Sequence, residues 1–164
     1  MKNNPSFTLV EILITIAVIS VATFGSFIAF NQFNKYQNLN VSYENLKHSL
    51  NIAKSNALAQ VINKCNTSQK FVGHQIRIIT TTNPDSYVLE EVCQNPLGIL
   101  PAEPSYRIKE TKFPSDVSVT SGSNTILFLV LTGKVRGTSD ISVILTNGTQ
   151  NKEITIGTSS GVIQ

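Results

Sequence analysis

The sequence is poor in charged residues, and the deficit is concentrated at one end. Charged residues make up 14% of the chain, well below the roughly 25% of an ordinary soluble domain. Between Lys2 and Lys35, Glu11 is the only charged residue. The net charge of +3 is too small, with thirteen basic residues scattered among ten acidic ones, to indicate a nucleic-acid-binding protein. This composition favours a membrane protein.

The uncharged stretch is too long for a cleavable signal sequence. Residues 12–30 are nineteen uncharged, mostly apolar residues, whereas a secretory signal has an apolar region of about 7–15 residues and a spanning helix needs about 20. No small-residue cleavage site follows Phe30, and the chain continues into Asn31 without Pro or Gly. We therefore expect residues 7–30 to form a retained transmembrane helix.

Proline and glycine are almost missing from the first part of the chain. No Pro lies within residues 6–83, and Gly25 is the only Gly before Gly73. Residues 31–64 then carry an apolar stripe at helical spacing. The stripe consists of Tyr36, Leu39, Tyr43, Leu46, Leu50, Ala53 and Ala57. This pattern predicts one helix from about Phe7 to about Gln60, with an amphipathic second half that packs on a sheet; the alternative is two helices with a break near Asn31.

The remainder, residues 65–164, has the pattern of a β-rich head. Asn147-Gly148 is a strong hairpin signal, and a turn-rich segment at residues 83–86 separates two further β-branched runs. If the first hairpin turns near Pro84, Gln75 and Cys93 lie roughly opposite each other. The expected strands are Gln75–Thr81, Tyr87–Val92, Tyr106–Lys109, Val117–Thr120, Thr125–Leu131, Asp140–Thr146 and Lys152–Gly157. The sequence thus predicts an α+β fold in which a long N-terminal helix packs on a C-terminal antiparallel sheet.

The chain lacks the motifs of the common enzyme classes. No nucleophile elbow, zinc-protease motif or phosphate loop is present. We expect His48, His74, Glu90 and Glu91 to be solvated surface groups, with the two glutamates pointing to opposite faces of a strand. We therefore expect no enzymatic activity, no catalytic residues and no cofactor.

Cysteine is rare too, with Cys65 and Cys93 the two that the chain contains. Neither belongs to a CxxC motif, so a metal site is not expected. A disulfide between them is chemically possible if the head is extracytoplasmic. Two free thiols are the alternative.

Glu11 is anomalous because a carboxylate inside an apolar segment usually has a partner or a function. Its position near the end of the segment also permits it to reach the headgroup region of a membrane. The other interpretation is that Glu11 neutralises a buried positive group on a neighbouring helix.

Phe7-Thr8-Leu9-Val10-Glu11, followed by an apolar run, resembles the type IV prepilin signature. The resemblance implies a leader of residues 1–6, cleaved between Ser6 and Phe7 by a prepilin peptidase, and methylation of the new N-terminus at Phe7. Glu11 would then pair with the terminal amine of an adjacent subunit during assembly, beside Thr8. The chain departs from the family pattern at Ser6, where the family nearly always has Gly.

The last forty residues resemble the head of H-type pseudopilins and FimT-type minor pilins. The similar segments are Ile126-Leu127-Phe128, Gly133, Ile141–Leu145, Lys152–Ile156 and Gly161-Val162-Ile163. The resemblance implies a minor pilin or pseudopilin, a structural subunit of a type II secretion pseudopilus or type IV pilus. Its expected partners are the prepilin peptidase, other pilin or pseudopilin subunits, an inner-membrane assembly platform and membrane lipid.

The expected location is the cytoplasmic (inner) membrane, with the head outside the cytoplasm and extraction into a filament on assembly. Two other functions stay open. The chain could be an uncleaved single-pass sensor or adhesin. It could also be a DNA-binding minor pilin, for which Lys134, Arg136 and Lys152 are weak candidate contacts because acidic residues lie close to them in sequence; DNA is not the expected partner.

Overall fold

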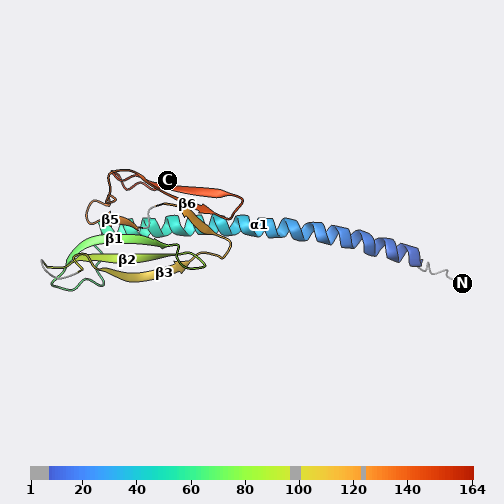
Figure 1. Ribbon diagram of the computed structural model, residues 1–164, viewed down its shortest axis with the longest axis horizontal. Coiled ribbons are helices and arrows are strands. Elements are labelled where there is room, and N and C mark those ends of the chain that lie inside the picture. The colour runs from blue at the N-terminus through green and yellow to red at the C-terminus, as the bar shows by residue number, and fades with distance from the viewer. Residues whose placement is uncertain (1–7, 97–100, 123–124) are drawn as a thin grey trace.

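The computed structural model describes residues 8–96, 101–122 and 125–164, without the side chains of residues 24–29. The described residues form one helix and seven strands. A long helix protrudes from a β-rich head, and the start of this helix lies far from the C-terminus along the longest axis of the molecule (Figure 1). The predicted α+β class is therefore confirmed.

Helix α1 runs without interruption from Leu9 to Leu58, fifty residues in all. At 1.5 Å per residue it is about 75 Å long. The alternative of two helices with a break near Asn31 is wrong, because no Pro or Gly pair is present there to interrupt the backbone hydrogen bonds. The structure thus confirms a single helix, which begins two residues later and ends two residues earlier than expected.

The expected membrane-spanning half of α1 is not borne out. Within the described part of the chain, no helix combines the length and the apolar character that crossing a membrane requires. The predicted span of residues 7–30 also includes Phe7 and the side chains of residues 24–29, which lie outside the described ones.

The head contains two antiparallel sheets, not the single sheet that the sequence predicted. The first has the order β3-β2-β1-β5, and the second has the order β4-β6-β7. Their strands are β1 (Lys70–Ile79), β2 (Ser86–Gln94), β3 (Ser105–Lys112), β4 (Ser118–Ser121), β5 (Thr125–Leu129), β6 (Ile141–Thr146) and β7 (Asn151–Ile156). Alternation along each strand identifies strands but not their neighbours, so the return of β5 to the edge of β1 could not be read from the sequence.

The register of the first hairpin differs from the expected one. Strand β1 begins at Lys70, five residues before the predicted start, and Cys93 lies opposite Phe71. Gln75 lies opposite Glu90. A register shift between Phe71 and Gly73 adds a residue to β1, and such a bulge cannot be located by counting from the turn.

The core lies between α1 and the two sheets, and α1 contacts strands of both. Five residues of the predicted helical stripe are completely buried: Leu39, Leu46, Leu50, Ala53 and Ala57. Tyr43 is partly buried, whereas Tyr36, where α1 leaves the head, is 44% exposed. The stripe therefore marks the face of α1 that binds the head, as its spacing predicted.

Three polar residues expected on the surface are buried. Glu90 is 2% exposed, and Glu91 and His74 are completely buried. Neighbouring elements cover both faces of β2 at these positions. Buried and exposed residues therefore do not alternate along β2, as they would in a strand with one solvated face. The prediction that Glu90, Glu91 and His74 are solvated is therefore wrong, while His48 is exposed as expected.

Candidate functional site

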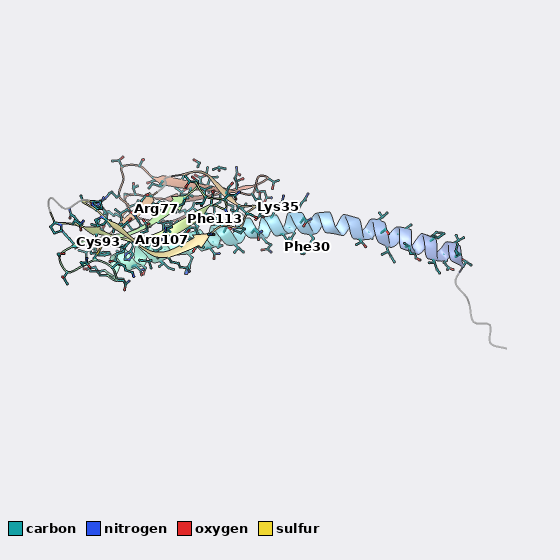
Figure 2. All side chains as sticks on the ribbon, turned by 60° about the horizontal axis from the view of Figure 1, so that its bottom comes forward. Phe30, Lys35, Arg77, Cys93, Arg107 and Phe113 are labelled. Atoms are coloured by element: carbon teal, nitrogen blue, oxygen red, sulfur yellow. A yellow bond between two sulfur atoms is a disulfide. The ribbon has the colours of Figure 1, made fainter. Side chains whose placement is uncertain are left out.

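The most conspicuous surface is on the part of α1 that protrudes from the head (Figure 1), where the described side chains of residues 9–23 are exposed on all sides of the helix and mostly apolar. Its large apolar side chains between Leu9 and Val21 are 50–77% exposed. Phe30, farther along the protruding part, is 60% exposed (Figure 2). Burying such a surface is favourable by roughly 25 cal/mol per Å². An exposed helix that is apolar all round is therefore a surface for other apolar elements.

The few polar side chains of this segment are satisfied within the helix. The hydroxyl of Thr15 donates to the carbonyl of Ile12 at 2.8 Å, and that of Ser20 donates to the carbonyl of Ile16 at 2.8 Å. Thr23 donates to Ile19 at 2.7 Å in the same way. Because these hydroxyls need no external partner, the segment can enter an apolar environment without leaving them unpaired.

Thr8 and Glu11 form a capping box at the start of α1. The backbone N–H of Glu11 donates to Oγ1 of Thr8 at 3.3 Å, and the N–H of Thr8 makes a long contact of 3.5 Å with Oε2 of Glu11. The Glu11 carboxylate thus points back toward the N-terminus of its own chain. The predicted processing site, Ser6 and Phe7, lies outside the described residues.

The far end of the head contains a disulfide between Cys65 and Cys93, with the two Cα atoms 5.7 Å apart. Figure 2 shows Cys93 at the end of the head opposite the protruding helix. Beside the disulfide, the buried carboxylate of Glu91 accepts hydrogen bonds from the backbone N–H groups of Asn63, Lys64 and Cys65 at 2.8–3.0 Å. The disulfide and these hydrogen bonds together attach the segment that follows α1 to strand β2.

A second buried carboxylate, Glu90, lies against Arg77 and accepts a hydrogen bond from Gln75 at 2.7 Å. Burial alone would raise the pKa of Glu90, but the hydrogen bonds from Arg77 and Gln75 and the charge of Arg77 together hold it below its usual value. Neither the Arg77–Glu90 pair nor the role of Glu91 was predicted from the sequence. Two consecutive carboxylates inside the otherwise apolar run of β2 were the available signal.

The three candidate DNA contacts do not form one basic patch. Arg136 is paired with Glu103 through two hydrogen bonds of 2.6 and 3.1 Å, and Glu103 has a lowered pKa chiefly because of them. The ammonium group of Lys152 lies 4.7 Å from the centre of the Tyr43 ring. Lys134 is exposed beside Gly133, which packs on Leu58. Tyr43 and Leu58 are about 22 Å apart along α1 at 1.5 Å per residue.

The acidic and thiol groups of the head offer one possible metal-ligand set in the described part of the chain, Cys65, Glu91 and Cys93. Both sulfur atoms are engaged in the disulfide, and the carboxylate is occupied by three N–H groups. This set is therefore committed to structure and offers no free thiolate to a metal ion.

Comparison with known proteins gives one match, and it falls on the N-terminal segment. Residues 1–27 match the family model described as the prokaryotic N-terminal methylation motif. No curated protein and no solved structure matches the chain. The matched range includes Phe7, Thr8 and Glu11, on which the sequence resemblance rests, and also Ser6, at which the chain departs from the family pattern. The match supports a type IV pilin-like protein of the prepilin type.

Proposed function

We propose that this protein is a minor pilin or pseudopilin, of the H-type, that is assembled into a type IV pilus or a type II secretion pseudopilus through helix α1. The observation that carries the proposal is the coincidence of the methylation motif at residues 1–27 with a helix whose protruding half is apolar on every side. A monomer in water would expose this surface at a large cost in free energy. Helices of neighbouring subunits in a filament core would cover it.

The proposal gives Glu11 a specific partner. Cleavage between Ser6 and Phe7 would create an amine two residues before Leu9, the first residue of α1, and the Glu11 carboxylate already points toward that end of the chain. Pairing with the amine of an adjacent subunit would neutralise both charges inside an apolar core. Before assembly, the Glu11 carboxylate instead accepts a hydrogen bond from the backbone N–H of Thr8 in the capping box.

Before assembly, we propose that the chain is held at the cytoplasmic membrane by the apolar part of α1, with the head outside the cytoplasm. The disulfide at the far end of the head favours an oxidising compartment for that domain. The partners are then a prepilin peptidase, an assembly platform, membrane lipid and other pilin-like subunits. The role is structural and non-enzymatic.

The experiment that tests processing is the intact mass and N-terminal sequence of the protein from membranes that contain a prepilin peptidase. We expect a chain that begins at Phe7 and carries one added methyl group. A Phe7→Asp variant, which places a charge at the cut, serves as the uncleaved control. A wild-type chain that still begins at Met1 would contradict the proposal and favour an uncleaved sensor or adhesin.

Assembly is tested separately with Glu11→Leu and with Glu44→Leu as its matched control. Both change one glutamate of α1, but Glu44 lies in the half that belongs to the head. We expect the Glu11 variant to be cleaved and inserted normally yet to be lost from sheared filaments or cross-linked subunit complexes, whereas the Glu44 variant is retained. Equal recovery of the two variants would remove the assigned role of Glu11.

A further inference from the structure

Strand β3 (Ser105–Lys112) forms one edge of the four-stranded sheet, and no described strand pairs with its outer side (Figure 1). It is also the most exposed strand of that sheet, with a relative exposure of 37% at Ile108. The outer backbone groups of such an edge can pair with another extended chain. Peptide recognition by strand addition uses edges of this kind.

A groove lies directly beside this edge, between β3 and α1. It has a volume of about 310 Å³, within the range of about 300–1,000 Å³ that is usual for binding pockets. Its lining is Val41, Ser42, Asn45, Tyr87, Thr111, Lys112, Phe113 and Pro114. Because alternate side chains of a strand point to the same face, a strand added to β3 would direct every second side chain toward α1 and this groove.

The groove contains a polar group that is buried and unused. Ser42 is 3% exposed, and its hydroxyl has no hydrogen-bond partner among the described residues. Asn45, on the next turn of α1, is exposed at the rim. A buried hydroxyl without a partner is uncommon in a finished interior. The Ser42 hydroxyl therefore lies beneath the surface of the groove, and the walls formed by Phe113 and Pro114 favour an apolar inward side chain.

The charged side chains of the β3 edge determine which kind of peptide it favours. Arg107 is paired with Glu110 on the same strand, whereas Lys109 and Lys112 are exposed and have no ion-pair partner within the described part of the chain. Figure 2 shows Arg107 and Phe113 along this side of the head. Two carboxylates near the groove's end accept hydrogen bonds from neutral groups, Asp116 from Asn38 and Asp85 from the backbone N–H of Val119, and neither belongs to β3. Within β3 itself, three basic residues outnumber the one acidic residue, Glu110. The edge is therefore net basic.

We propose that the β3 edge and the adjoining groove bind an extended acidic peptide segment of a partner protein by strand addition. The segment pairs its backbone with the outer side of β3. Because Lys109 pairs with Leu89 and Lys112 with Ser86, the two lysines point to opposite faces of β3, and acidic side chains on each face of the segment meet one of them. An apolar inward side chain occupies the groove. This interaction goes beyond the proposed filament function and does not depend on processing at Phe7 or on Glu11.

The test uses the full chain in detergent micelles and three eight-residue peptides. The probe repeats Glu-Glu-Val-Val, which places acidic side chains on both faces of the added strand. One control has Lys in place of each Glu, and the other keeps the charges of the probe but has Pro in place of the first two Val residues, which removes backbone donors. We expect the probe to slow amide hydrogen exchange within residues 105–112, and both controls to bind at least about tenfold more weakly. Equal binding of all three peptides, or no binding of the probe, would overturn the proposal.

Two pairs of variants locate the site. Lys109→Glu/Lys112→Glu should weaken binding of the probe by about tenfold, while Lys64→Glu/Lys134→Glu, with the same change in net charge at exposed positions, should not. Asn45→Phe should block the groove, and Asn51→Phe, an exposed position on α1 outside its lining, should bind normally. If the variants of either pair bind alike, the assigned site is wrong.

Concentration-dependent protection of residues 105–112 without peptide would identify a second copy of the chain as the occupant and would overturn the proposal of an acidic partner.

Discussion

The backbone N–H of Cys65 donates to the carboxylate of Glu91 at 2.8 Å, and Cys65 is also bonded through its sulfur to Cys93, two residues beyond Glu91. A covalent and a charged link therefore hold the same point of the chain to β2. The point lies seven residues after the end of α1. Consequently, the orientation of the head on the helix is fixed at its far end as well as along the buried stripe.

Removal of the disulfide should destabilise the head without unfolding α1. The bond closes a loop with a sequence separation of 28 residues, and constraint of a loop of that size stabilises by about 3–4 kcal/mol in the chain-entropy model. We expect Cys65→Ser/Cys93→Ser to lower the free energy of unfolding by about that amount in urea titrations. Reductant should destabilise the wild type equally and leave the double variant unchanged; a wild type insensitive to reductant would contradict this role.

Loss of the Glu91 carboxylate should release the segment after α1. Glu91→Ala leaves three N–H groups, those of Asn63, Lys64 and Cys65, without their acceptor. We expect a loss of about 2–4 kcal/mol. Amide exchange of these three residues should accelerate more than that of β6, which Glu91 does not contact. Uniform acceleration across the head would show that Glu91 contributes to global stability alone.

His74 should make the stability of the head depend on pH. It is completely buried, and neither ring nitrogen has a hydrogen-bond partner among the described residues. Burial lowers its pKa from the usual value of 6.5, although the charge of Glu91 partly opposes this shift. Below pH 6.5 the unfolded chain therefore takes up a proton that the folded chain resists. Stability should fall as the pH drops from about 6.5 toward the folded pKa, by at most about 1.4 kcal/mol per pH unit.

The matched variant for this pH dependence is His74→Phe, which keeps an aromatic ring next to Phe71, whose ring centre lies 5.3 Å from that of His74. Urea titrations of both proteins at pH 7 and pH 5.5 give the comparison. We expect the loss of stability between these two pH values to be smaller in the variant. Identical losses would assign the dependence to other groups. The Glu90 carboxyl, whose pKa is lowered, acts in a separate window, because its contribution is lost only below about pH 4.5.

Gly161 should be irreplaceable, in contrast to Gly148. Both have positive φ, +62° and +84° respectively, and a side chain in this conformation costs roughly 1–2 kcal/mol. A Cβ at Gly161 would also lie 2.2 Å from the carbonyl oxygen of Gly133, whereas one at Gly148 would meet nothing within 4 Å. Gly161→Ala should therefore lower the melting temperature clearly more than Gly148→Ala. Equal losses would mean that the two glycines are needed for φ alone.

The sequence by itself determined the helix and the class of surface that it presents. The absence of Pro, the near absence of Gly and the 3.6-residue spacing of the stripe leave no other regular structure for residues 9–58. The uncharged run predicted a membrane span, which the described residues do not bear out, although their side chains there are mostly apolar and exposed. The motif around Phe7 and Glu11 predicted the match at residues 1–27. These features are local, so the chain specifies them without reference to its tertiary structure.

Tertiary structure decided the rest. Which strands are neighbours, where a bulge shifts the register and which carboxylates are buried all depend on contacts between residues far apart in sequence. Glu90 and Glu91 illustrate the point, because a strand pattern assigns them to opposite faces but cannot show that Arg77 covers one and the segment after α1 covers the other. Burial of a charge is possible only where such partners converge, and that convergence is a property of the folded head.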